Sequence, residues 1–229
     1  MRPIFFSVCG VGGCGKSTTI NGLKKIFKSN KLYFTREVGG VGSSVAEAIR
    51  GIILSNDLPK MDALTEEQLV LATRIAHMYD VVLPKLASDI HVICDRCLLS
   101  SLAIQGYLRG IGIEVVYDDH VRIFKRFPTV LGVENPFKTI APVPDVIYFL
   151  DLPMEDSLRR LQGRDAKDND RIDLEPNDSY RLIYEGYQES IKFLQDKLNY
   201  HGIVRIDARG TPEEIVAEIA NDIRRRTDS

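Results

Sequence analysis

The sequence predicts an α/β protein in which helices flank both faces of a five-stranded parallel sheet. Two observations predict it. Five short apolar segments alternate with segments whose apolar residues recur at helical spacing. Each connection is also long enough to cross over the sheet, so that successive strands run parallel. No repeat, low-complexity tract or linker divides the chain, and we expect a single domain over residues 1–229.

The expected elements follow in order along the chain. We expect strands at residues 4–8, 32–35, 91–94, 144–151 and 203–207. We expect helices at residues 18–27, 44–54, 65–86, 118–127, 154–161 and 178–199, with a further helix from residue 98 and a last one from residue 212. A ligand should bind at the carboxyl ends of the strands, where Gly10, Arg36, Asp95 and Asp151 would gather.

Capping residues indicate where two of these helices begin. Ser43 or Ser44 is placed to cap the helix at residues 44–54. Thr65 and Gln68 have the spacing of a capping box for the long helix that follows. Pro84 lies near the end of that long helix, as helix breakers do. The helix is expected to carry an apolar stripe made of Leu69, Ala72, Ala76, Tyr79 and Leu83.

Composition excludes several classes of partner. The chain holds 30 Lys and Arg against 32 Asp and Glu, so its net charge of −2 favours neither nucleic acid nor an anionic membrane as a partner. No window approaches the roughly 18 apolar residues of a membrane span. Four cysteines fit a reducing compartment better than a disulfide framework. We therefore expect a cytoplasmic protein.

A glycine-rich segment follows the first expected strand. Residues 10–17 match the pattern G-x-x-x-x-G-K-[ST] and lie between a strand and a helix. In such a loop, backbone N–H groups surround phosphate oxygens, while Lys16 and the helix dipole add positive charge. The Ser17 hydroxyl would bind Mg²⁺. The segment predicts a nucleoside triphosphate site with contacts from Gly10, Val11, Gly12, Gly13, Cys14, Gly15, Lys16, Ser17 and Thr18.

Two further segments bear on this site. Asp95 ends the third expected strand, which is typical of the Walker-B carboxylate that helps to hold Mg²⁺. As an alternative, Asp95 caps the helix that begins near Leu98. Residues 162–173 are charged and poor in apolar side chains. That segment is either a solvated loop or a lid whose arginines, Arg164 and Arg171, meet phosphates.

The cysteines pose one alternative to a purely phosphate-binding site. Cys94 and Cys97 form a C-x-x-C pair, and Cys9 and Cys14 would lie nearby if the first and third strands are neighbours. A zinc site or a redox pair is one interpretation. Small buried side chains are the other, because Cys94 belongs to an apolar strand and Cys14 lies inside the phosphate loop.

Six blocks, in the right order along nearly the whole chain, resemble the thymidylate kinases. Neither the Asn-Lys-x-Asp of GTPases nor the Leu-Ser-Gly-Gly of transporter ATPases is present. The matching blocks are the loop at residues 10–19, Thr35-Arg36-Glu37-Val38-Gly39-Gly40 with Arg50, Arg74 ahead of Pro84, Asp95-Arg96 with Ser100-Ser101-Leu102-Ala103-Ile104-Gln105-Gly106, the strand at 144–151, and Asp170-Arg171-Ile172-Asp173 with Arg164.

The resemblance implies a three-layer P-loop kinase fold with a mobile lid at about residues 162–175. It implies transfer of the γ-phosphoryl of ATP to a nucleoside monophosphate, with dTMP as the first choice, Mg²⁺ held by Ser17 and Asp95, and a homodimer packed through the long helices. The implied catalytic residues are Lys16, Asp95, Arg96, Arg164 and Arg171. The implied acceptor-binding residues are Arg36, Glu37, Arg50, Val70, Arg74, Arg96, Ser101 and Gln105.

The chain departs from the pattern of that family at several positions. Gly13 stands where some members carry the catalytic arginine, so an arginine in the lid is implied instead. Gly12 replaces an acidic residue, Val70 replaces an aromatic residue, and Cys97 and Ile104 replace tyrosines. The acceptor pocket is therefore altered, and two alternatives stay open. One is a kinase of a different or modified nucleotide, or of another phosphorylated small molecule; the other is a regulatory nucleotide-binding homologue without transfer.

Overall fold

A computed structural model describes residues 2–28, 31–126, 143–163 and 177–227. Within these ranges, five parallel strands form one sheet in the order β2-β3-β1-β4-β5. The strands are β1 (Phe5–Cys9), β2 (Leu32–Arg36), β3 (His91–Asp95), β4 (Val146–Asp151) and β5 (Ile203–Asp207). The predicted parallel sheet is confirmed, and β1 lies at its centre.

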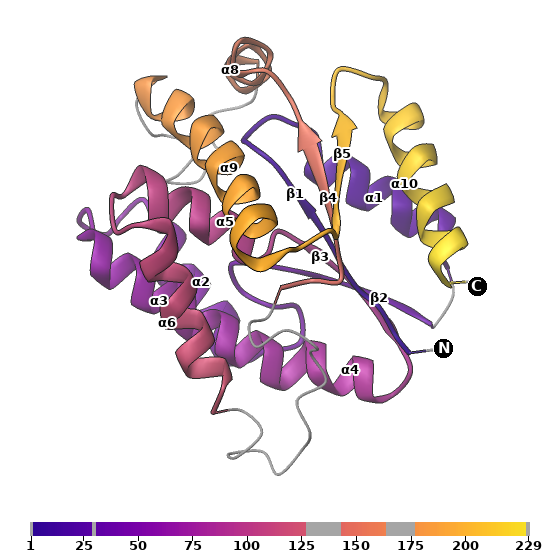
Figure 1. Cartoon of the computed structure of the whole chain (residues 1–229), viewed down its shortest axis with the longest axis horizontal. Helices are drawn as coiled ribbons and strands as arrows, with labels where there is room; N and C mark the ends of the chain where they lie inside the picture. The colour runs from indigo at the N-terminus through magenta and orange to yellow at the C-terminus, as the bar shows by residue number, and fades with distance from the viewer. Residues whose placement is uncertain (1, 29–30, 127–142, 164–176, 228–229) are drawn as a thin grey trace.

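Helices fill most of the described connections. They are α1 (Lys16–Ile26), α2 (Ser44–Leu54), α3 (Ala63–His77), α4 (Leu83–Ala87), α5 (Leu98–Ser101), α6 (Ile113–Phe124), α8 (Met154–Gln162), α9 (Asn177–Leu198) and α10 (Pro212–Thr227), with π-helical segments η1 (Met78–Val82) and η2 (Leu102–Leu108). Figure 1 shows α1 and α10 on one side of the sheet and α9 with the α3 to α6 region on the other. The three-layer α/β architecture is therefore confirmed.

The strands are apolar because both faces of the sheet are covered. All five residues of β1 are buried. Along β3, Ile93 packs into the larger core cluster, whereas Val92 and Cys94 pack into a second cluster with Leu71, Met78 and Leu86 of the α3–α4 region. This alternation of side chains across the sheet anchors the long helical region on one face.

Two helix starts differ from the prediction. Ser43 does cap α2, since its hydroxyl accepts a hydrogen bond from the N–H of Ala46 at 3.2 Å. The Thr65–Gln68 capping box is wrong: α3 begins earlier, at Ala63, and Asp62 caps it by accepting the N–H of Thr65 at 2.9 Å. The predicted start of the next helix at residue 118 is also wrong. The helix α6 begins at Ile113, directly after Gly112, which has a positive φ.

The long helix predicted at residues 65–86 exists, but η1 interrupts its hydrogen-bond pattern. Pro84 lies just beyond η1; it has no N–H to donate, and its ring crowds the carbonyl four residues back. The predicted apolar stripe is not the buried face of this region. Tyr79 is 53% exposed, and Leu69, Ala72, Ala76 and Leu83 are only half-buried. One row of buried residues recurs every four positions: Glu66, Val70, Arg74, Met78, Val82 and Leu86. Glu67, Leu71, Thr73, His77 and Val81 are buried beside it.

Close packing of α9 on η2 gives a testable prediction for the fold. A Cβ on Gly186 would lie 2.6 Å from the carbonyl oxygen of Ala103 in η2, whereas a Cβ on Gly51 in α2 meets nothing within 4 Å. We expect Gly186→Ala to lower the free energy of unfolding by about 1–3 kcal/mol and Gly51→Ala to raise it by about 0.5–1 kcal/mol. Urea unfolding measures both. Equal stabilities of the two variants would contradict this close approach of α9.

Candidate active site

The phosphate loop joins β1 to α1 with the geometry that its glycines permit. Gly13 (φ 70°) and Gly15 (φ 95°) adopt left-handed backbone conformations that other residues rarely accept. A Cβ on Gly13 would lie 2.9 Å from the carbonyl oxygen of Ser157 on α8. Lys16 opens α1, and its ammonium donates to the carbonyls of Gly10 at 3.0 Å and Val11 at 2.7 Å. The loop therefore holds a positive charge against its own backbone.

The carboxyl ends of β2 and β3 lie beside this loop. Arg36 and Asp95 are register partners at the ends of these strands. Arg96 follows with a positive φ of 70°, and its guanidinium donates to the hydroxyl of Tyr187 at 3.1 Å. Asp95 does not cap the next helix, since Cys97 occupies the cap position of α5. Asp95 instead lines the same cavity as the phosphate loop.

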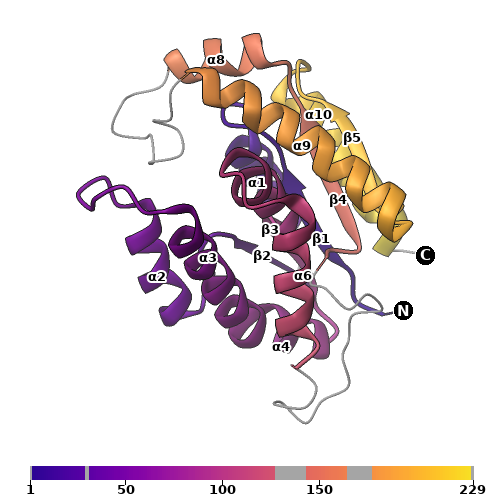
Figure 2. The same ribbon diagram turned by 60° about the vertical axis from the view of Figure 1, so that its left-hand side comes forward.

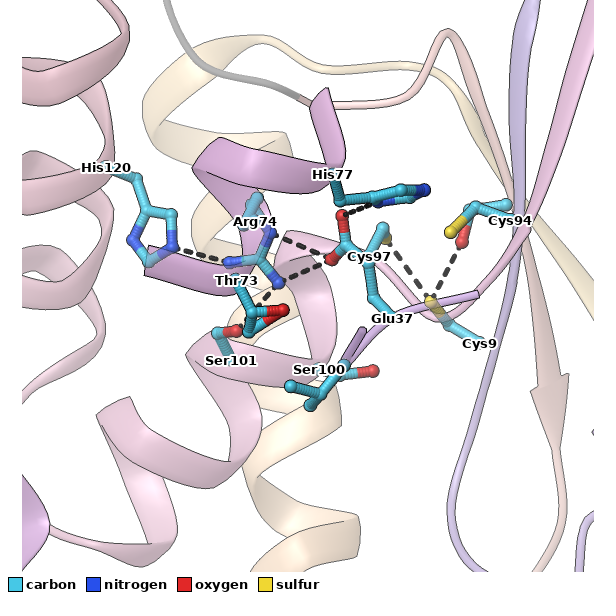
Figure 3. Close-up of polar contacts among 12 residues, drawn as sticks. Cys9, Glu37, Thr73, Arg74, His77, Cys94, Cys97, Ser100, Ser101 and His120 are labelled. Carbon is cyan, nitrogen blue, oxygen red and sulfur yellow. Dashed lines mark hydrogen bonds and ion pairs between the residues drawn. The ribbon is translucent and has the colours of Figure 1, made fainter. Parts of the chain in front are cut away.

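A buried arginine organises the far side of the site (Figure 3). Arg74 Nε donates to Glu37 Oε2 at 2.8 Å, and its Nη2 donates to Ser101 Oγ at 2.9 Å. The side chains of Arg74 and Glu37 are 3% and 5% exposed. His77 Nδ1 lies 3.3 Å from the second carboxylate oxygen of Glu37. Burial alone would raise the pKa of Glu37, but Arg74 and His77 outweigh it and lower that pKa to about 2.

Two further arginines lie near the turn after β2. Arg36 Nη2 pairs with Glu47 Oε2 at 2.6 Å, and the two side chains are 42% and 35% exposed. Arg50 Nη1 donates to the carbonyl of Val38 at 2.5 Å. Exposed ion pairs of this kind contribute little to the stability of the fold. A bound anion could therefore replace Glu47 as the partner of Arg36 with little loss of stability.

One cavity of about 280 Å³ brings these groups together. Its walls come from the phosphate loop, the ends of β2 and β3, α2, α3, α5 and η2. The described residues that line it are Gly12, Gly13, Gly15, Lys16, Ser17, Thr18, Arg36, Glu37, Val38, Arg50, Ile53, Leu54, Glu66, Val70, Arg74, Asp95, Arg96, Cys97, Ser100, Ser101, Ile104 and Gln105. Several cations along one cavity suit phosphate-bearing ligands.

Comparison with known proteins identifies the family of this chain. A family model described as thymidylate kinase matches residues 8–131. The thymidylate kinase of Bacillus cytotoxicus is 34% identical over 221 residues, which cover 96% of each chain. That of Clostridium novyi is 33% identical over 220 residues, covering 95% of this chain and 97% of its own. The chain belongs to the thymidylate kinase family. The predicted resemblance is thus confirmed, and with it the class of enzyme, a phosphotransferase.

Most residues that were predicted from resemblance to thymidylate kinases border the cavity. All eight acceptor-binding candidates do so, as do Lys16, Ser17, Thr18 and Asp95. Gly10, Val11 and Cys14 lie outside the lining, and the Val11 and Cys14 side chains are buried beneath the loop. Asp151 ends β4 at the same edge, but it pairs with Arg205 at 2.8 Å and does not line the cavity. Arg164 and Arg171 lie outside the described residues, as does most of the expected lid.

The departures from the thymidylate kinase pattern cluster in the same place. Gly12, Val70, Cys97 and Ile104 all line the cavity. These departures therefore alter the cavity wall, although Cys97 also packs in the core against Cys9.

Several cavity residues carried no signal that was recognised in the sequence. Glu66 is 2% exposed, accepts the side-chain amide of Gln105 at 2.8 Å, and pairs with Arg109 at 3.1 Å. Glu66 lies four residues before Val70 and eight before Arg74, so all three lie on one helical face. That spacing was the available clue that Glu66 belongs to the site. Nothing in the sequence singled out His120, a lone histidine in α6.

The cysteines form a thiol contact rather than a cluster of four. Cys9 and Cys97 Sγ atoms lie 3.3 Å apart. The ligand atoms of Cys94 instead group within 4.8 Å of those of Glu37 and His77, the one such cluster in the described ranges. Glu37 already pairs with Arg74, and His77 Nε2 bonds to Thr35 Oγ1 at 2.8 Å. Burial also holds the pKa of Cys94 well above its usual value, which favours the thiol over a metal-binding thiolate.

None of the helices in the described part of the chain has both the length and the apolar character needed to cross a bilayer.

Glu67 is a buried carboxylate behind Arg74. It is 1% exposed, and neither carboxylate oxygen has a hydrogen-bond partner in the described ranges. His120 Nδ1 lies 3.6 Å from Oε1, which is too long for a hydrogen bond. Burial raises the pKa of Glu67 to about 7, although the charge of Arg74 acts in the opposite direction.

We expect Glu67→Gln to stabilise the protein by about 2–3 kcal/mol at about pH 8, with a much smaller gain at about pH 5. Because folding raises this pKa from 4.5 to about 7, the native state binds more protons than the unfolded chain in that window. Wild-type stability therefore falls as pH rises through it. Urea unfolding at both pH values measures the effect.

The matched control is Glu218→Gln, which removes an exposed carboxylate on α10. It should change stability by less than about 0.5 kcal/mol at either pH. An equal gain for Glu67→Gln at both pH values would show that ionisation of Glu67 is not the cause.

Proposed function

We propose that this protein transfers the γ-phosphoryl group of ATP to dTMP, giving ADP and dTDP. Membership of the thymidylate kinase family supports the reaction. The observation that carries it is the single cavity that Lys16 and the phosphate loop line together with Arg36, Arg74 and Arg96. Arg96 lies close to Lys16, since both donate to the carbonyl of Gly10. Phosphoryl transfer needs two phosphates held in line and their charge neutralised, more than it needs covalent help.

At the donor end, the loop would bind the triphosphate of ATP. Lys16 now donates to neutral carbonyls, and anionic β- and γ-phosphate oxygens are stronger acceptors for its ammonium. The residues also fit Mg²⁺, because Ser17 and Asp95 offer hard oxygen ligands and both line the cavity. When bound, the ion would neutralise charge between the phosphates. The other assigned nucleotide contacts are Gly10 to Gly15 and Thr18.

At the acceptor end, Arg96 and Arg36 would grip the monophosphate, because a guanidinium fork matches its oxygens. Tyr187 supports Arg96 from α9. Arg50 lies beside Arg36 and would complete the anion site. Val70, Arg74, Ser101 and Gln105, with Glu37 behind Arg74, would surround the nucleoside.

The catalytic arginine would come from the lid. Gly13 leaves no side chain in the loop to reach the phosphoryl in flight, so Arg164 and Arg171 are assigned this duty. Their charge would stabilise the transition state and not only the bound nucleotide.

A homodimer would form through the outer face of α3 and its neighbour α2. Figure 2 shows α2, α3 and α6 side by side at one end of the molecule. Leu64 is 65% exposed, Tyr79 53% and Val45 55%. These exposed apolar side chains are thus available for a second copy of the chain. Nucleic acid is not an expected partner, and the cytoplasm is the expected compartment.

A coupled ADP-release assay over deoxynucleoside and ribonucleoside monophosphates tests the function. We expect dTMP to be turned over fastest, at about 1–100 s⁻¹. Faster turnover of another monophosphate would overturn the assignment of the acceptor, and the altered residues Gly12, Val70 and Ile104 would then explain the choice. No turnover of any acceptor, with ATP still bound, would leave only a regulatory role.

Variants of the cationic residues test their roles. Lys16→Ala should lower kcat by about 100-fold or more, whereas Lys25→Ala, an exposed lysine of the same helix, should leave it unchanged. Arg164→Ala and Arg171→Ala should lower kcat more than ATP affinity, because the lid acts on the transition state. Steady-state kinetics with ATP-binding calorimetry measures both. Full activity of both lid variants would refute the assignment of the catalytic arginine.

A further inference from the structure

His120 contacts the cavity arginine from outside the cavity. It belongs to α6, is fully buried, and is not among the residues that line the site. Its Nε2 lies 2.5 Å from Nη1 of Arg74 (Figure 3). Its Nδ1 lies 2.8 Å from the carbonyl oxygen of Val116, one turn earlier in α6. The ring is therefore fixed at both nitrogens.

These two contacts determine the tautomer of the ring. A carbonyl only accepts hydrogen bonds, so the proton must lie on Nδ1 and point at Val116. A guanidinium only donates, so Nε2 must be the bare, accepting nitrogen that faces Arg74. The imidazole is thus neutral and oriented. Burial lowers the pKa of His120 to about 3, and the charge of Arg74 acts in the same direction, so the ring stays neutral at ordinary pH.

The charged neighbours of this contact act in opposite directions: burial and Arg74 favour the neutral ring, whereas the charge of Glu37 favours a protonated one and is outweighed. Arg74 and Glu67 face the ring from α3, and Glu37 lies on the far side of the guanidinium. A protonated ring would place a second positive charge against Arg74 and would remove the acceptor of its Nη1 group. The neutral ring instead completes a set of three partners that meet the guanidinium from different elements: Glu37 after β2, Ser101 on α5 and His120 on α6.

We propose that His120 is a positioning residue for Arg74, which it holds in the orientation that recognises the nucleoside of the acceptor. The proposal rests on the proposed function, in which Arg74 contacts the acceptor. Without an acceptor at Nε2, the guanidinium would keep its bonds to Glu37 and Ser101, but its Nη1 would lose the third contact that holds its orientation toward the cavity. The residue acts through Arg74, because it does not itself line the cavity.

Two substitutions separate this role from simple packing. In His120→Gln, the side-chain oxygen reaches the place of Nε2 and still accepts from Arg74. In His120→Asn, the shorter amide still donates to the carbonyl of Val116 but does not reach Arg74. The pair therefore differs in the contact to Arg74, while both variants replace a buried ring with a smaller amide.

Steady-state kinetics with the wild-type protein and both variants is the first test, with thermal unfolding measured alongside. We expect His120→Asn to raise KM for dTMP about tenfold to a hundredfold, as expected for a lost hydrogen bond to a charged group. KM for ATP and kcat should change less than about threefold. His120→Gln should restore KM for dTMP to within about threefold of wild type. Equal KM values for the two variants, whether normal or raised, would overturn the proposal.

A long-range ¹H–¹⁵N spectrum of the histidine rings is the second test, and it needs no activity. The His120 resonances, identified by their loss in His120→Gln, should show the proton on Nδ1 and a bare Nε2. A proton on Nε2 would overturn the proposal. If the wild-type protein turns over another monophosphate in preference to dTMP, the proposed acceptor fails, and the same KM comparison is made with the preferred nucleotide.

Discussion

The buried ion pair between Arg74 and Glu37 is the interaction on which the site depends. Burying two charges is favourable only when good geometry and further hydrogen bonds compensate for lost hydration. Here Ser101, His77 and His120 provide those bonds, and each comes from a different segment of the chain. The pair therefore ties the end of β2, α3, α5 and α6 to one another, and it places a fixed positive group in the cavity wall.

The sequence was sufficient to predict the sheet and the phosphate loop, because strong local rules govern both. Glycines at fixed spacing after an apolar strand permit few conformations, as Gly13 and Gly15 show. The sequence was insufficient for the faces of the long helix. The apolar stripe predicted from periodicity includes Tyr79, which is exposed. It does not include Glu66, which is buried because Gln105 and Arg109 bind it. Burial of charged side chains depends on such distant partners.

The site residues that belong to sequence motifs could be predicted, whereas those that depend on contacts between distant segments could not. Residues within motifs, such as Lys16, Asp95 and Arg96, line the cavity where strand ends meet. His120 could not be found, because its contact with Arg74 joins helices 46 residues apart in sequence and follows from packing alone. The departures at Val70 and Ile104 were readable as departures, yet only the cavity shows that they share one wall.

The π-helical segment η1 keeps the buried residues of the long helical region on one side along its whole length. In a regular α-helix every fourth residue advances by about 40° around the axis, so five such steps would turn Leu86 to the side opposite Glu66. The wider turn at Met78–Val82 offsets this drift, and residues at intervals of four from Glu66 to Leu86 stay buried. The first half of this continuous helical region therefore carries residues that line the cavity, and its second half carries residues that pack on the sheet. The cavity wall and the core consequently share one continuous element.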